Sequence, residues 1–240
     1  MNLAIKKAML YNHQGIIIAR AGKNRSALKY FNLAIKNYPD LPLRRNHDLR
    51  YRLYSNRGLT KEHLYDFKGA LADYNHTLSL NPQYAIGYCN RGGVKYNLKH
   101  YIEAIQDFKR AISYRSHYPK AWFFLGMAES RSKRLKAAIK TFTILTRIIP
   151  KSFVPFFERG CVYLNLDQYS KAAQDFQKSL KSTPIDDSSK VAILNNLGMT
   201  ENNLHHYQQA KNHLRTALKL IPGNQYATTN LKIAQRGLNK

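Results

Sequence analysis

Apolar residues recur along the chain at spacings of three and four, which is typical of amphipathic helices. Between residues 119 and 152, one predicted helix face carries Trp122, Leu125, Gly126 and Glu129, and a second carries Ala138, Phe142 and Leu145. Pro150 ends the second helix, because proline lacks the backbone N–H that a helix interior needs. This stretch therefore predicts two antiparallel helices, packed through small residues that face each other and are flanked by aromatic residues.

The same pattern occurs six times. Glycines stand 34 residues apart at Gly58, Gly92, Gly126 and Gly160, and Gly15 and Gly198 occupy the corresponding places nearer the two ends. Each is followed after twelve residues by an alanine, and four residues later by Phe31, Tyr74, Phe108, Phe142, Phe176 or Leu214. A period of this length indicates stacked helical hairpins, since one hairpin cannot bury both of its faces alone.

An aromatic residue also precedes the first five of these glycines by four residues, and a proline closes five of the six units. This combination resembles the tetratricopeptide repeat family over nearly the whole chain. The resemblance implies an all-α fold, a right-handed α-solenoid of six stacked helix-turn-helix repeats plus a C-terminal capping helix.

We predict a single solenoid domain over residues 1–240. Its repeats are predicted at 8–41, 51–84, 85–118, 119–152, 153–186 and 191–224, with the capping helix at 225–238. Two insertions interrupt the period. Residues 42–50 are predicted to form a basic loop that extends into the following helix, and residues 186–189 to supply helix-capping side chains.

Composition adds a strong charge imbalance. The chain has 39 Lys and Arg against 14 Asp and Glu, a formal net charge of +25. A field of this sign favours acidic partners. A compositional bias toward lysine, with solvated lysines on the outer surface, would give the same number, so both interpretations stay open.

We expect neither a secretion signal nor a membrane-spanning helix, because no apolar run approaches about 18 residues. A whole repeat separates Cys89 from Cys161, which should keep their Cα atoms beyond the roughly 7 Å limit for a disulfide. These features predict a cytoplasmic location and leave the oligomeric state open.

The sequence contains no recognisable motif of catalytic residues. No metal-ligand spacing occurs among the histidines and cysteines, and Gly92-Gly93 lacks the Gly-Lys-Ser/Thr that completes a phosphate loop. We therefore predict a protein that is not an enzyme and that carries no cofactor or metal.

In tetratricopeptide repeat proteins, a second stripe of each first helix lines a concave groove, and the resemblance implies the same here. The predicted binding residues are Arg52, Asn56, Asn90, Lys120, Phe123, Met127, Arg131, Phe157 and Asn196. Asparagines at one repeat position can pair with the backbone of an extended peptide, because a side-chain amide has donors and an acceptor. Abundant asparagine on an exposed helix face, and phenylalanines packed against the adjacent repeat, are the alternative interpretations.

The sequence thus predicts a scaffold that binds a peptide or helical segment of an acidic partner protein in the groove. Binding of an anionic polymer such as RNA through the basic surface is the alternative. Steep salt dependence would distinguish the second from the first.

Overall fold

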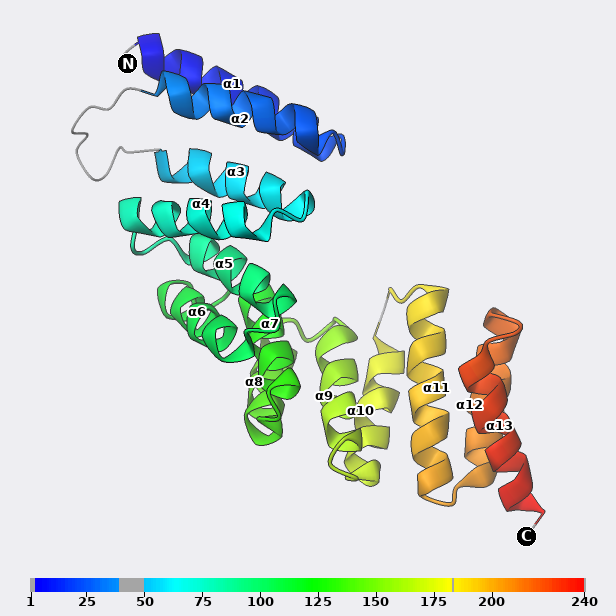
Figure 1. Ribbon diagram of the computed structural model, residues 1–240. Coiled ribbons are helices and arrows are strands. Elements are labelled where there is room, and N and C mark those ends of the chain that lie inside the picture. Colours follow the sequence, from blue (N-terminus) through cyan, green and yellow to red (C-terminus); the bar gives the residue numbers. More distant parts are fainter. Residues whose placement is uncertain (1–2, 39–49, 183, 240) are drawn as a thin grey trace. The chain divides into compact units, whose positions relative to one another are not determined.

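The computed structural model describes residues 3–38, 50–182 and 184–239. These residues form thirteen helices and no strand (Figure 1). The prediction of an all-α helical repeat fold is therefore confirmed. In chain order the helices are α1 (Leu3–Arg20), α2 (Asn24–Asn37), α3 (Arg50–His63), α4 (Phe67–Leu80), α5 (Ala85–Asn97), α6 (Tyr101–Tyr114), α7 (Pro119–Arg131), α8 (Leu135–Ile148), α9 (Val154–Leu164), α10 (Tyr169–Lys181), α11 (Asp187–Asn203), α12 (Tyr207–Leu220) and α13 (Gln225–Leu238).

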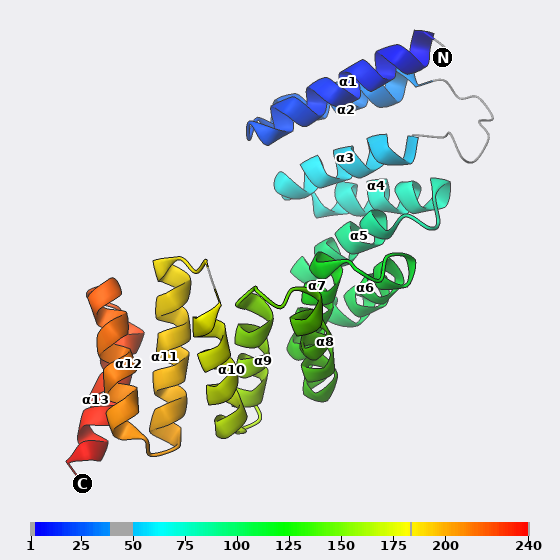
Figure 2. The ribbon, with the colours of Figure 1, turned by 180° about the vertical axis from the view of Figure 1, so that it is seen from behind.

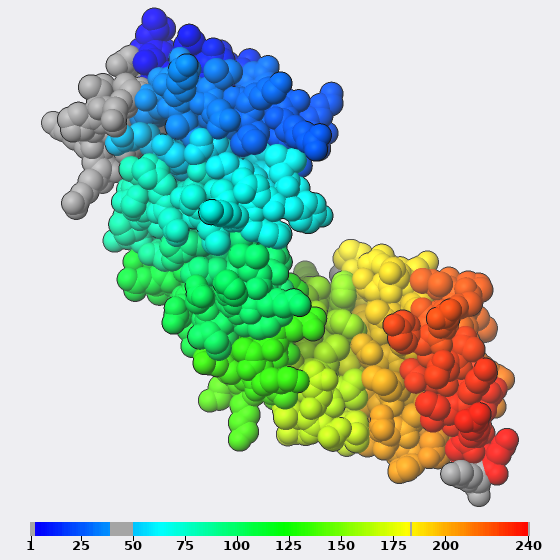
Figure 3. All heavy atoms as spheres, in the orientation of Figure 1, coloured from blue at the N-terminus to red at the C-terminus, as the bar shows by residue number. Residues whose placement is uncertain are grey.

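The chain forms two compact units, an N-terminal unit of Met1–Ala121 and a C-terminal unit of Trp122–Lys240. Three hairpins, α1/α2, α3/α4 and α5/α6, build the N-terminal unit. The C-terminal unit contains α8 to α13 and most of α7, with α9/α10 and α11/α12 as hairpins and α13 packed against α11 and α12 (Figure 2). Within each unit, successive repeats occupy successive bands of the surface (Figure 3). Inside each unit, a repeat therefore packs on its sequence neighbours, as expected of stacked repeats.

The capping side chains of the second insertion lie where the sequence predicts them. The carboxylate of Asp186 accepts hydrogen bonds from the backbone N–H and the hydroxyl of Ser189, at 2.9 and 2.7 Å, and so caps α11. Helix α13 spans the predicted capping helix. Of the first insertion, residues 42–49 lie outside the described residues, and Arg50 begins α3.

The packing inside a hairpin differs from the prediction that small residues face each other. At Gly126, an added Cβ would lie 2.7 Å from atoms of the Phe142 ring. The same holds in the other repeats, where each repeat glycine faces the bulky residue sixteen positions later. The glycine therefore makes room for an aromatic ring of the second helix, or for Leu214 in the sixth repeat, while the alanines are buried elsewhere in the core.

The turn inside each hairpin contains one residue in the left-handed region. This residue is Gly22 in the first repeat, and Tyr65, Lys99, Lys133, Asp167 and His205 in the following ones. The backbone N–H groups around it close a helix C-cap, for example from His100 to the carbonyl of Lys95 at 2.9 Å. The six turns therefore share one conformation, although only the first has the residue best suited to it.

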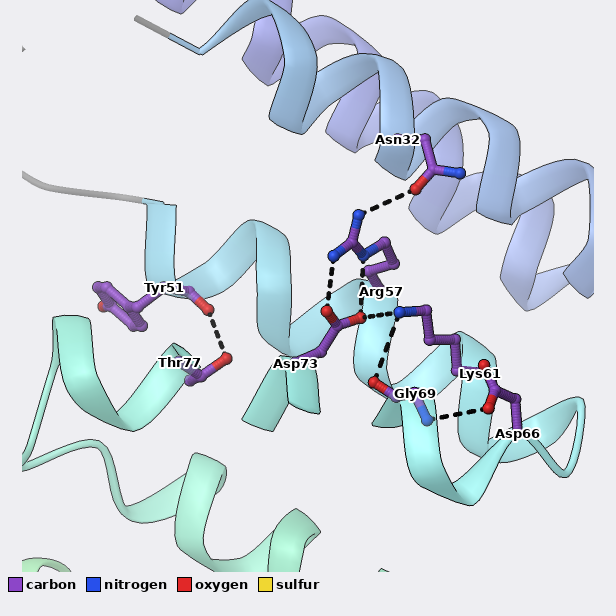
Figure 4. Close-up of polar contacts among 8 residues, drawn as sticks. All are labelled: Asn32, Tyr51, Arg57, Lys61, Asp66, Gly69, Asp73 and Thr77. Atoms are coloured by element: carbon purple, nitrogen blue, oxygen red, sulfur yellow. Dashed lines mark hydrogen bonds and ion pairs between the residues drawn. The ribbon is translucent and has the colours of Figure 1, made fainter. Parts of the chain in front are cut away.

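Arginine–aspartate pairs join the two helices of three hairpins. Arg57 donates two hydrogen bonds to Asp73, at 2.9 and 2.6 Å, and a third to Asn32 of the preceding repeat at 3.0 Å (Figure 4). Lys61 also contacts Asp73, at 2.9 Å. Arg91 with Asp107 and Arg159 with Asp175 repeat this fork. Each arginine therefore ties its own hairpin to the one before it.

Two other hairpins carry the acid on the opposite helix. Leucines, Leu125 and Leu197, replace the arginine in the fourth and sixth repeats. There the buried acids belong to the first helix. Glu129 accepts from the Thr141 hydroxyl at 2.6 Å, and Glu201 lies 2.8 Å from Nδ1 of His213. The buried polar contact is thus kept in both arrangements.

Each unit has an inner and an outer face. First helices contact one another, α1 with α3, α3 with α5, α9 with α11 and α11 with α13. Among the described helices, no such contact joins α2 with α4, α4 with α6, α8 with α10 or α10 with α12. The first helices therefore form the inner face of a unit, and the second helices its outer face.

Candidate functional site

The inner face of the N-terminal unit is polar. Nδ2 of Asn56 donates to Oδ1 of Asn12 at 2.9 Å, which links the first two repeats, and Asn90 is buried at 7% exposure. Arg52 is exposed, and its Nε donates to the hydroxyl of Tyr51 at 3.0 Å. Asn56 therefore contacts the neighbouring repeat and Asn90 is covered, whereas Arg52 is open to a ligand.

The N-terminal unit also contains a half-buried carboxylate, that of Glu62. Burial raises the pKa of Glu62, although the hydrogen bond from the Tyr74 hydroxyl at 3.1 Å and the charge of Lys120 both oppose the shift. Lys120 is exposed at the start of α7, within the N-terminal unit. The structure therefore places a predicted cation close to an acid that sequence reasoning had not selected.

The inner face of the C-terminal unit begins with one stripe of α7. Phe123, Met127 and Arg131 follow one another at intervals of four residues. Phe123 and Met127 are half-buried and pack against a core cluster that contains Phe142 and Val162, whereas Arg131 is exposed. The stripe thus runs from core packing at one end to an exposed cation at the other.

Phe157 lies in a different cluster. Its ring centroid is 5.9 Å from that of Phe176 in the same hairpin, and it packs against the cluster that includes Ile193 and Leu197. The structure therefore does not gather Phe157 into one cluster with Phe123 and Met127. Packing accounts for part of the surface of all three side chains, as the alternative interpretation of the sequence held.

Glu158 and Cys161 occupy the neighbouring turn of α9. Burial raises the pKa of Glu158, and the positive charge of Arg131 opposes the shift. Burial and the Glu158 carboxylate together raise the pKa of Cys161 to about 12. A thiol with this pKa stays protonated at neutral pH and is a poor nucleophile.

Asparagines continue the inner face through α11 and α13. Nδ2 of Asn196 donates to Sγ of Cys161 at 3.8 Å, Nδ2 of Asn230 to Oδ1 of Asn195 at 3.0 Å, and Nδ2 of Asn202 to the carbonyl of Asn230 at 2.9 Å. These contacts join the fifth repeat, the sixth repeat and α13. Sequence reasoning could not find them, because they depend on how each amide is turned.

A pocket of about 400 Å³ opens at this place in the C-terminal unit. Asn195, Asn196 and Asn224 supply polar lining, and Val191 and Tyr226 are among its apolar and aromatic walls. Tyr226 is 75% exposed. The pocket therefore offers amides beside apolar surface, a combination suited to a peptide backbone and its side chains.

Neither a cluster of metal-ligating side chains nor a helix able to cross a membrane occurs in the part of the chain that the structure describes. The cysteines are both free thiols, with Cys89 buried and Cys161 half-buried.

Solved structures of several repeat proteins superpose on the chain. One is the C-terminal part of a repeat-containing protein from Cytophaga hutchinsonii, with 16% identity, 93% of this chain and 87% of that chain covered, and a TM-score of 0.75. Another is pilF of Pseudomonas aeruginosa, with 17% identity, 95% and 98% covered, and a TM-score of 0.73. A third, YrrB, is described as a repeat protein with an unusual peptide-binding site; it has 20% identity, 84% and 97% covered, and a TM-score of 0.67. Identities this low indicate a shared fold alone.

No curated protein matches the sequence significantly. Family profiles described as tetratricopeptide repeat match residues 89–153, 156–186 and 191–224, which together make up more than half of the chain. The matched residues include four of the six hairpins, and the period, the hairpins and the solved structures agree with them. The chain belongs to the tetratricopeptide repeat family.

Proposed function

We propose that the protein is a non-enzymatic scaffold that binds a peptide or helical segment of a partner protein on the inner face of its repeats. Tetratricopeptide repeats generally mediate protein–protein interactions. The observation that carries the finer proposal is the asparagine-lined pocket of the C-terminal unit, beside which Tyr226 is exposed. The exposed Arg131 of the same unit favours an acidic segment, as Arg52 and Lys120 do on the inner face of the N-terminal unit. We also propose a cytoplasmic location, in keeping with two free cysteines.

Selection from a displayed library of random peptides tests the proposal directly. We expect enriched peptides to carry Asp or Glu and to bind the chain with micromolar affinity, as measured by fluorescence anisotropy. Asn196→Ala should weaken binding about tenfold, since a lost hydrogen bond at a peptide contact costs roughly 1–1.5 kcal/mol. The matched control is Asn212→Ala, an exposed asparagine on α12 of the outer face. Equal affinities of the two variants would place the peptide elsewhere.

Replacement of the predicted aromatic anchor separates binding from packing. Phe123→Leu keeps most of the volume that packs on the Phe142 cluster and removes the ring. Because aromatic side chains are frequent anchors of interfaces, we expect a selected peptide to bind several-fold more weakly. Phe156→Leu, a half-buried phenylalanine at a helix-packing position, should leave affinity unchanged. If both variants bind like the unaltered chain, Phe123 is only a packing residue.

A further inference from the structure

Five of the 14 acidic side chains of this protein lie inside the fold. Asp73, Asp107, Glu129, Asp175 and Glu201 are buried, and four of the five lie within 3 Å of a cationic or histidine side chain of the same hairpin. The negative charges of these four are therefore paired inside the fold. The surface is more basic than an even distribution of the 14 acidic residues would make it.

Buried acids and exposed cations are most completely separated on the outer face of the C-terminal unit. Across α8, α10 and α12, the only acidic residue is the buried Asp175. The same three helices carry exposed cations, which we call the outer basic face: Lys136, Lys140, Arg147, Lys171, Lys178, Lys181, Arg215 and Lys219. In the part of the chain that the structure describes, none of them is paired with a carboxylate.

Part of this face repeats with the hairpins. Arg147, Lys181 and Lys219 each follow the glycine of their repeat, Gly126, Gly160 or Gly198, by 21 residues. They therefore occupy one equivalent position in three consecutive repeats, which we call the cation ladder. The first repeat also has an exposed lysine, Lys36, at this position, but the second and third repeats have Ser79 and Ser113 there. Only in the C-terminal unit do cations therefore follow one another at this position in consecutive repeats.

Helix stability explains only part of the pattern. Arg147, Lys181 and Lys219 stand in the last turns of their helices, where a cation is favourable next to the negative end of the helix dipole. Lys136 and Lys171 stand in first turns, where the dipole opposes a cation, and these turns contain no acid. The positive charge therefore follows the surface and not the ends of the helices.

The neutral residues on the face match one kind of polyanion. Gln174, Gln177, Asn212 and Thr216 are exposed among the cations. Lys and Arg accompanied by Gln, Asn and Thr are the side chains that contact phosphates and sugars of nucleic acids. Ile144 is the only large apolar side chain exposed on the three helices, which gives little to insert into a lipid surface.

No phenylalanine or tyrosine of these helices is exposed. Phe142 and Phe176 are buried, and Tyr169 and Tyr207 are half-buried, with hydroxyls that contact Asp167 and His205, each at 2.7 Å. Proteins that hold single strands stack bases on exposed aromatic rings. We propose that the outer basic face binds the sugar–phosphate backbone of double-stranded nucleic acid, independently of sequence.

Charge removal at matched positions tests this. The full chain is titrated against fluorescein-labelled RNA and DNA duplexes of 20 base pairs at several potassium chloride concentrations. The ladder variant is Arg147→Gln, Lys181→Gln, Lys219→Gln. The control is Lys29→Gln, Lys68→Gln, Lys109→Gln, which removes one exposed lysine from each second helix of the N-terminal unit. Circular dichroism establishes that both variants keep their helices.

We expect the ladder variant to bind about tenfold more weakly at 0.15 M salt, and the slope of log affinity against log salt to fall by about three. The control should lose less than about threefold, because it changes only the long-range field. The preferred duplex, if there is one, identifies the source of the phosphates. Equal losses in the two variants, or ladder-dependent binding to phosphatidylserine vesicles without binding to either duplex, would overturn the proposal.

Discussion

At the scale of single residues, the carboxyl groups of Glu62 and Glu158 on the inner face lie in half-buried surroundings that disfavour their charged forms. Glu158 is half-buried next to Phe157, and burial raises its pKa against the attraction of Arg131. A carboxyl group whose pKa is raised by folding stabilises the fold while it is protonated, and this contribution is lost as pH rises through the folded pKa.

Glu158→Gln should therefore raise the free energy of unfolding at pH 7, where the carboxylate of the unaltered chain is charged. The difference should shrink as pH falls and vanish below about pH 4, the usual range of the unfolded carboxyl group. Urea unfolding followed by circular dichroism at pH 7, 5.5 and 4 measures it. A variant that is less stable at pH 7 would mean that attraction to Arg131 outweighs burial.

The left-handed turn residues give a second test at this scale. Lys133 has φ of 64°, at the turn position where the first repeat has Gly22. Lys133→Gly should stabilise the chain by roughly 0.5–1 kcal/mol, since relief of left-handed strain exceeds the entropy that glycine adds to the unfolded state. The midpoint of urea unfolding measures this. Lys140→Gly, at an exposed position inside α8, should instead destabilise it by about 1 kcal/mol. A loss of stability in both would show that Lys133 makes contacts worth more than its strain.

At the scale of helices, the sequence predicts what depends on period and misses what depends on orientation. The 34-residue spacing of the glycines places the hairpins, and the stretch from Gln225 is correctly read as one helix. The prediction that Gly126 faces a small residue was wrong, because the period alone does not say whether the facing residue is Ala138 or Phe142. Burial of the asparagine amides likewise depends on contacts between repeats.

The arginine–aspartate forks were missed although their signal is in the sequence. Arginine stands directly before the repeat glycine at Arg57, Arg91 and Arg159, and aspartate stands sixteen residues later, directly before the bulky residue. This spacing equals that of the glycine and its facing ring, so the two contacts share one register. An arginine and an aspartate that have the same 16-residue spacing as the glycine and its facing residue therefore predict a buried ion pair.

We expect Asp107→Asn to destabilise the chain by about 3 kcal/mol, because it removes the buried carboxylate that pairs with Arg91 and leaves Lys95 only the exposed Glu103 as a partner. Glu103→Gln is the matched control. Glu103 lies 3.5 Å from the same Lys95, but its side chain is 57% exposed, and exposed pairs contribute less than about 1 kcal/mol. Urea unfolding compares the two variants. Similar losses would mean that burial of Asp107 adds nothing to the pair.

At the scale of the whole molecule, the compact units are the feature that the sequence does not indicate. The period continues from Gly92 to Gly126 without insertion, while the boundary between the units falls between Ala121 and Trp122. Repeat spacing reports which residues pack inside a hairpin, and the extent of packing between hairpins depends on surfaces that keep no such period. The net charge of +25, in contrast, follows from the sequence, and the structure adds which acidic side chains are buried.

This distribution predicts how stability responds to salt. Exposed positive charges repel one another over distances set by the Debye length, which falls from about 30 Å at 0.01 M to about 10 Å at 0.1 M salt. The buried pairs, such as Arg91 with Asp107, are screened much less. The free energy of unfolding should therefore rise between 0.01 and 0.3 M sodium chloride, as measured by urea unfolding at each concentration. The ladder variant, with three fewer positive charges, should show a shallower rise. Stability that falls with salt in both chains would mean that attraction within ion pairs outweighs repulsion across the surface.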